Sequence, residues 1–141
     1  MIYALYESLR IIREEGLERR YERHLLHSRA FGAGVTAMGL HLFAQEGYRA
    51  PMLMAVAIPE GVDDAAVRRY LLSNYRLEIG GGLGPLKGRI WRVGLMGHSC
   101  SSENVVLLLA GLEGALAAQG VPVELGAGIE AAREVYGASG M

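Results

Sequence analysis

The chain has 141 residues, of which 51% are apolar, and its formal net charge is −1. These values are typical of one globular domain with a single core, and they exclude the concentrated basic stripe of a nucleic-acid-binding protein. No apolar run approaches the roughly 20 residues that a membrane helix needs, so we expect no membrane partner. The single cysteine, Cys100, excludes an internal disulfide and is typical of a cytoplasmic protein.

The first 39 residues are predicted to form two helices. Apolar residues recur at helical spacing over residues 2–12, and Gly16 predicts the end of this first helix. A second helical pattern begins at Leu17. It contains Gly32 and Gly34, which each cost a helix about 1 kcal/mol and therefore indicate close packing against a neighbour. No capping residue precedes the first helix, which is how a fragment of a longer chain would begin; the alternative is a start methionine on a short helix.

The middle of the chain is predicted to contain strands on either side of one helix. Asp63 is a suitable N-cap for that helix, which should end near Asn74. Short apolar segments bounded by turn residues indicate the strands. They are expected at residues 40–44, 52–58, 76–79 and 89–96.

Two further helices are expected at the C-terminal end. Ser101 predicts the N-cap of a helix that Gly120 ends, residues 121–128 form a connector, and residues 129–136 form a last short helix. The order of elements implies an α+β fold, in which helices cover a small antiparallel or mixed sheet of about four strands. Residues 1–141 are read as a single domain, with residues 121–141 as its less clearly defined tail.

A glycine-rich segment, Ile-Gly-Gly-Gly-Leu-Gly-Pro at residues 79–85, is the first candidate site. Glycine lets a backbone turn sharply and approach a ligand closely. Pro85 and Gly88 argue against a following helix, so the segment is neither a dinucleotide fingerprint nor a P-loop. Two interpretations stay open: a flexible hairpin-like loop, or a loop whose backbone amides line a site.

Arg92 is the second candidate, because it lies in the middle of a predicted apolar strand. Strand alternation places it on one face with Ile90 and Gly94. A buried arginine needs an anionic partner, and its planar fork suits a carboxylate. The alternative is an arginine on a solvated strand face. The opposite face carries Trp91, Val93 and Leu95.

The remaining candidates give no catalytic constellation. His24 and His27 have a metal-compatible spacing but no evident third ligand, which favours a solvated or helix-packing pair. His98 follows the Arg92 strand and is a candidate for the same pocket. Cys100 is read as a small buried thiol, and Lys87 is the only lysine.

Three motifs in order resemble the C-terminal domain of the class V aminotransferases. They are the glycine-rich segment, Trp-Arg-Val-Gly-Leu-Met-Gly at residues 91–97, and Ser-Ser-Glu-Asn-Val at residues 101–105. The resemblance covers nearly the whole chain, less clearly from Val121 onward. It is strongest to the alanine–glyoxylate and serine–pyruvate or serine–glyoxylate enzymes. It implies a fold-type I homodimer that uses pyridoxal phosphate to move an amino group from alanine or serine to glyoxylate or pyruvate.

The resemblance also implies roles for particular residues. By position in the motif, Arg92 pairs with the substrate carboxylate. The loop formed by Gly81, Gly82, Leu83 and Gly84 lies near the same site.

The resemblance further implies that important groups lie outside this chain. In the family the Schiff-base lysine and other cofactor-binding residues belong to a large N-terminal domain, and Lys87 is not in the position of that lysine. We therefore expect that the isolated chain neither holds the cofactor covalently nor transaminates. The alternatives are a stand-alone α+β module that binds a small carboxylic acid for regulation, and a purely structural dimerisation domain.

Overall fold

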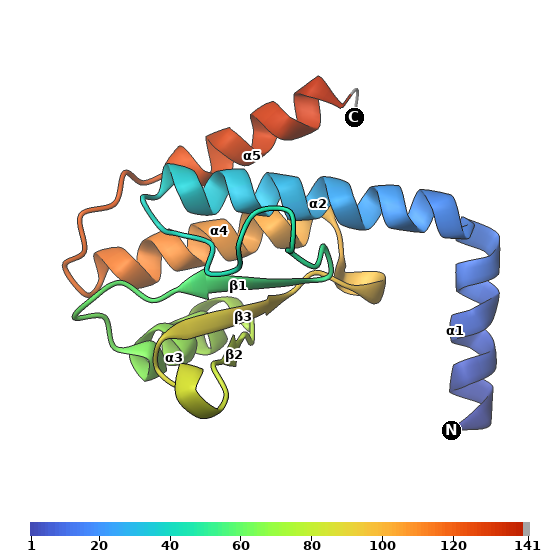
Figure 1. Ribbon diagram of the computed structural model, residues 1–141, viewed down its shortest axis with the longest axis horizontal. Helices are drawn as coiled ribbons and strands as arrows, with labels where there is room; N and C mark the ends of the chain where they lie inside the picture. The colour runs from blue at the N-terminus through green and yellow to red at the C-terminus, as the bar shows by residue number, and fades with distance from the viewer. Residues whose placement is uncertain (140–141) are drawn as a thin grey trace.

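The computed structural model describes residues 1–139 and shows two helices, a small sheet and further helices packed on that sheet (Figure 1). The helices are α1 (Ile2–Glu15), α2 (Leu17–Ala37), α3 (Asp64–Tyr75), α4 (Ser102–Ala117) and α5 (Ala127–Ala138). The strands are β1 (Leu53–Ala57), β2 (Gly80–Gly81) and β3 (Ile90–Gly94). Two short 3-10 helices, η1 (Gly84–Leu86) and η2 (Gly97–Ser99), flank β3 in the sequence.

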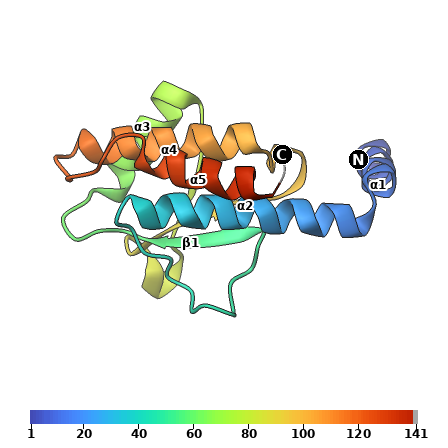
Figure 2. The same ribbon diagram turned by 90° about the horizontal axis from the view of Figure 1, so that it is seen from above.

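The sheet is antiparallel, and β3 is its central strand. The strand order is β1-β3-β2, with Leu53 opposite Gly94 and Gly80 opposite Arg92. In Figure 2 the helices α2, α3, α4 and α5 lie on one side of β1. An antiparallel sheet can be packed on one face only, and this arrangement confirms the predicted α+β class.

Two of the predicted strands are wrong in their positions. Residues 40–44 contribute only an isolated bridge, Leu42 opposite Val56, because the chain turns again at residues 45–48. Residues 76–79 form no strand, because Arg76 adopts a left-handed conformation and the Leu77 N–H bonds back to the end of α3. The chain joins the sheet only at Gly80. Three strands are therefore found where about four were expected.

The core fills the space between the covered face of the sheet and the helices. α2 packs closely on α4 and α5 at Gly34, where a Cβ atom would lie 2.6 Å from Leu109 Cδ1 and 2.7 Å from the Gly128 carbonyl oxygen. This contact explains why a glycine is used inside α2. The fully buried side chains of the core include Phe31, Val56, Leu71, Trp91, Leu109, Leu112 and Leu116.

The C-terminal segment is anchored by one buried carboxylate. Glu113 of α4 is 3% exposed and accepts hydrogen bonds from the backbone N–H groups of Gly126 and Gly128, each at 2.8 Å. A carboxylate at the first turn of a helix satisfies N–H groups that have no partner within the helix. Glu113 therefore fixes the start of α5, which runs alongside α2 (Figure 1).

α1 differs from every other helix, since none of its residues is buried. It lies beyond one end of α2 and clear of the sheet in both views (Figures 1 and 2). No helix within residues 1–139 combines the length and the apolar character needed to cross a membrane.

Candidate substrate-carboxylate site

Arg92 lies at the centre of β3 on the face of the sheet that the helices leave open. Its side chain is half-buried, and its Nε–H donates a hydrogen bond of 2.8 Å to the Gly81 carbonyl oxygen. Within residues 1–139, no carboxylate oxygen lies within 4.0 Å of the guanidinium group. One edge of the guanidinium is therefore fixed, and the two Nη groups stay available to an anion.

Gly80 provides the space that this arginine occupies. A Cβ atom at Gly80 would lie 3.2 Å from Arg92 Nη2, tighter than most real Cβ contacts. Gly80 belongs to the glycine-rich segment at residues 79–85, but the set of residues predicted to bind substrate begins at Gly81. Only the pairing of Gly80 with Arg92 across β2 and β3 reveals its role, and that register has no local signature in the sequence.

The rest of the glycine-rich loop folds into a compact turn. A Cβ atom at Gly82 would lie 1.9 Å from the Leu86 carbonyl oxygen, so the turn closes on itself at this point. The turn also packs on Ile90, which is only 3% exposed although it shares the open face with Arg92. Leu83 is exposed, and Gly84 begins η1. Among the described residues, only Gly81 of the predicted loop set is hydrogen-bonded to Arg92, and substrate contacts of Gly82, Leu83 and Gly84 stay predictions.

Comparisons with known proteins identify the family to which the chain belongs. No family model matches the chain. The chain is 47% identical over 136 residues to the (S)-ureidoglycine–glyoxylate transaminase of Bacillus subtilis, covering 96% of this chain and 33% of that protein. It is 37% identical over 116 residues to the alanine–glyoxylate aminotransferase of Callithrix jacchus, covering 82% of this chain and 28% of that protein.

Solved structures give the same result. The crystal structure of a ureidoglycine–glyoxylate aminotransferase from Bacillus subtilis matches with a TM-score of 0.92 and 47% identity, covering 95% of this chain and 35% of that one. The structure of a pyridoxamine–pyruvate aminotransferase from Mesorhizobium loti matches with a TM-score of 0.89 and 36% identity, covering 93% and 34%. The chain is the counterpart of the C-terminal part of class V aminotransferases. It spans about a third of the length of these relatives.

On the covered face of the sheet, hydrogen bonds fix Trp91, the residue before Arg92. Trp91 Nε1–H donates to Asp64 Oδ1 at 3.0 Å, and Arg68 Nε–H donates to the same oxygen at 2.8 Å. The guanidinium of Arg68 lowers the pKa of Asp64. Asp63 is the N-cap of α3, as predicted, whereas the Asp64 carboxylate accepts the hydrogen bond of the buried Trp91 indole.

The histidine pair of the aminotransferase domain is engaged in packing. His24 Nε2 accepts a hydrogen bond from the Gly97 N–H at 3.2 Å. His27 is buried, its Nδ1 is hydrogen-bonded to the Tyr136 hydroxyl at 2.9 Å, and burial lowers its pKa. Burial also raises the pKa of Tyr136 to about 12. These contacts tie α2 to α5 and to the loop after β3, in line with a helix-packing pair. The described residues contain no group of metal-ligating side chains.

His98 lines a different space from Arg92. It borders a cavity of about 720 Å³ between α1, the start of α2 and η2, together with Glu15, Arg23 and Cys100. Arg92 is not among the residues that line this cavity. Cys100 is 1% exposed, as the sequence predicts, and burial raises its pKa.

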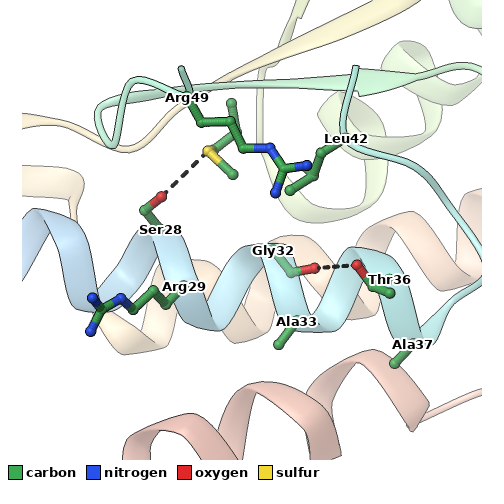
Figure 3. Close-up of a pocket in the computed structure, with 9 residues that line it drawn as sticks. Ser28, Arg29, Gly32, Ala33, Thr36, Ala37, Leu42 and Arg49 are labelled. Carbon is green, nitrogen blue, oxygen red and sulfur yellow. Dashed lines mark hydrogen bonds between the residues drawn. The ribbon is translucent and has the colours of Figure 1, made fainter. Parts of the chain in front are cut away.

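A second cavity of about 600 Å³ lies between α2 and the segment that leads into β1 (Figure 3). Arg49 reaches over α2 from that segment, and its Nε–H donates to the Ala44 carbonyl oxygen at 2.9 Å. The buried Ser28 hydroxyl donates to Met54 Sδ at 3.4 Å. Small residues of α2 form the floor, and Arg92 is again absent from the lining.

Proposed function

We propose that this chain is the small, C-terminal domain of a pyridoxal-phosphate-dependent aminotransferase, and that Arg92 anchors the carboxylate of its substrates. The reaction is the transfer of an amino group from alanine or serine to glyoxylate or pyruvate. The observation that carries the proposal is the half-buried guanidinium of Arg92, fixed at Nε and free of any carboxylate within residues 1–139. The aminotransferase relatives, whose names include glyoxylate or pyruvate, support the reaction class.

The fixed orientation of Arg92 suits a small carboxylic acid. A guanidinium can bind a carboxylate through two parallel N–H donors, and a charge-assisted pair of this kind is stronger than a neutral hydrogen bond. The Gly81 carbonyl oxygen occupies the Nε donor, and neither Nη group donates a hydrogen bond to another group within residues 1–139. Amino acid and keto acid share a carboxylate, so one anchor serves both halves of a transamination.

The residues of this chain do not by themselves fit the cofactor. Lys87 is the only lysine, and it lies exposed at the end of η1. We therefore assign no chemical step through pyridoxal phosphate to these residues. The proposal places the cofactor, its Schiff-base lysine and the binding site for its phosphate in a large domain, and it makes the whole enzyme a cytoplasmic homodimer.

The test compares the isolated chain with a full-length polypeptide that includes the sequence encoded upstream of Met1. Both are incubated with pyridoxal phosphate, alanine or serine, and glyoxylate or pyruvate. We expect turnover and internal-aldimine absorbance from the full-length protein and neither from the isolated chain. Turnover by the isolated chain would overturn the proposal.

The same experiment addresses the regulatory alternative. If the upstream sequence encodes no cofactor-binding domain and the isolated chain binds glyoxylate with an affinity that Arg92→Lys abolishes, the chain is a carboxylate-binding module. If there is no large domain and the isolated chain does not bind glyoxylate either, the result favours a structural dimerisation domain.

A further inference from the structure

Polar contacts hold the elbow between α1 and α2. Gly16 separates the two helices with φ +83°, a conformation that favours glycine. Because α1 buries no side chain, apolar packing contributes little to its direction. Its last residue, Glu15, accepts hydrogen bonds from Arg20 and Arg23 of α2.

Arg23 does more than pair with Glu15. Its Nε–H and Nη2–H donate to the two carboxylate oxygens of Glu15 at 2.5 and 3.0 Å. Its Nη1–H donates to the carbonyl oxygens of Gly97 and Cys100 at 3.2 and 2.6 Å. One half-buried guanidinium therefore joins the end of α1, the second turn of α2 and the loop that follows β3. Within residues 1–139 the Arg20 side chain donates a hydrogen bond to Glu15 alone, at 2.7 Å, so it does not make the link to the loop.

We infer that Arg23 is a positioning residue that couples the direction of α1 to the loop between β3 and α4. Glu15 supplies the connection on the α1 side, and the Gly97 and Cys100 carbonyl groups supply it on the β3 side. The cavity of about 720 Å³ beside this contact leaves α1 room to move when the contact is removed.

Arg23 and Glu15 form an ion pair that is partly shielded from solvent. The hydrogen bond from Arg23 is the largest of the effects that lower the pKa of Glu15 to about 2. The side chains of Arg23 and Glu15 are 28% and 21% exposed, so solvent screens the pair less than a surface salt bridge. His24 reinforces the same loop through the Gly97 N–H.

The inference rests on the proposed function in one respect. If α1 leads into the large domain, Arg23 sets the distance between the strand that carries Arg92 and the groups of that domain. A displacement of about 1 Å in such a distance can reduce catalysis by roughly a hundredfold.

The first experiment measures the direction of α1 in the 141-residue chain. Spin labels are attached to Tyr3→Cys on α1 and Leu72→Cys on α3, two exposed positions, in a Cys100→Ala background. We expect one narrow distance distribution in the parent chain and a broad one with either Arg23→Gln or Glu15→Gln. Arg19→Gln, a change at an exposed arginine three residues after Gly16, is the matched control and should leave the distribution narrow. A narrow distribution in Arg23→Gln, or an equally broad one in Arg19→Gln, would overturn the inference.

The second experiment follows the loop after β3 through the single cysteine. Cys100 is buried, so it reacts with a thiol reagent only when the loop opens. Arg23→Gln should raise its labelling rate by roughly tenfold or more, since two charge-assisted hydrogen bonds to the loop are lost. Glu15→Gln should raise the rate to a smaller but measurable extent, because Arg23 keeps its contacts with the loop and loses its connection to α1. A labelling rate in Glu15→Gln equal to that of the parent chain would refute the coupling, and circular dichroism checks that both variants are folded.

In the full-length protein the two proposals give different kinetic results. Arg23→Gln should lower kcat more than it raises KM, and Arg92→Lys should do the reverse. Unchanged kinetics in Arg92→Lys would count against the carboxylate site and leave the spin-label result to decide on Arg23. A rise in KM alone in Arg23→Gln would refute its positioning role.

Discussion

Trp91 and Arg92 are adjacent residues of β3 that serve the two faces of one sheet. Trp91 is fully buried against the helices, and its indole N–H is bound by Asp64. Arg92 lies on the open face, half-buried, with its guanidinium steered by a backbone carbonyl and matched to no carboxylate within residues 1–139. On the covered face the indole N–H of Trp91 has its hydrogen-bond partner within the domain. On the open face the two Nη groups of Arg92 donate to no other group within residues 1–139.

If Arg92 binds the substrate carboxylate as proposed, the two faces of the sheet separate stability from recognition. Burying a polar group costs little folding free energy when the group keeps a hydrogen-bond partner. Burying a charge without a partner costs much more, and the cost rises with the depth of burial. The domain leaves Arg92 half-exposed and so keeps it available to an anion without an internal partner. Changes on the two faces should therefore have different effects.

The largest effect is expected from Trp91→Ala on the covered face. Removal of this fully buried side chain should reduce the free energy of unfolding by about 3–5 kcal/mol, through lost burial and the cavity left behind. Urea denaturation of the isolated chain measures it. Arg92→Gln is the control on the other face and should change the same quantity by about 1 kcal/mol or less. Equal losses would show that both faces stabilise the fold.

Arg92→Lys should give the next largest effect, on substrate binding and not on stability. The lysine keeps the charge and loses the two-pronged donor, which we expect to cost about 2–3 kcal/mol in substrate binding. Steady-state kinetics of the full-length protein should show it as a raised KM for both the amino acid and the keto acid. A stability loss comparable to that of Trp91→Ala would instead assign Arg92 to the core.

Gly80→Ala should have a smaller effect on the same site. The added Cβ would press on Arg92 Nη2 and shift the guanidinium, which we expect to cost about 1 kcal/mol, or roughly fivefold in KM. Gly94→Ala is the matched control in the same sheet, because its Cβ would make only an ordinary 3.5 Å contact with Met96. Equal KM values for the two variants would mean that Arg92 tolerates crowding from β2.

The smallest effect concerns the pH dependence of the covered face. Arg68 and Trp91 lower the pKa of Asp64 in the folded chain relative to about 3.9 in the unfolded one. Asp64 therefore contributes stability above that pH, and the contribution disappears as the pH falls through the folded-state pKa. The difference in unfolding free energy between the parent chain and Asp64→Asn should be constant near neutral pH and shrink below about pH 4. A difference that stays constant down to pH 2 would show that protonation of Asp64 does not contribute to the loss of stability in acid.

Local patterns predicted the helices and their caps well. Asp63 and Ser101 accept hydrogen bonds from backbone N–H groups at the starts of α3 and α4, as their positions before apolar periodic segments indicate. The alternation along β3 also correctly placed Arg92 and Trp91 on opposite faces of the sheet. These features depend on residues a few positions apart, which is why one sequence is sufficient to read them.

Contacts between distant segments could not be predicted in the same way. Residues 40–44 have the composition of a strand, but they run beside β1 for a single bridge. Gly80 becomes a site residue only because the hairpin register sets it opposite Arg92. Arg23 carries no sequence signature, since its partners lie 8, 74 and 77 residues away.

The sequence by itself determined the α+β class, the helix boundaries to within a few residues, the aminotransferase family and Arg92 as the candidate anchor. Helical periodicity, capping and strand alternation are local, and the family motifs are contiguous. The tertiary structure decided which glycine accommodates Arg92, which edge of its guanidinium is held, and how Arg23 links α1 to the loop after β3. Those features arise where distant backbone segments meet, and their geometry depends on the packing of the whole domain.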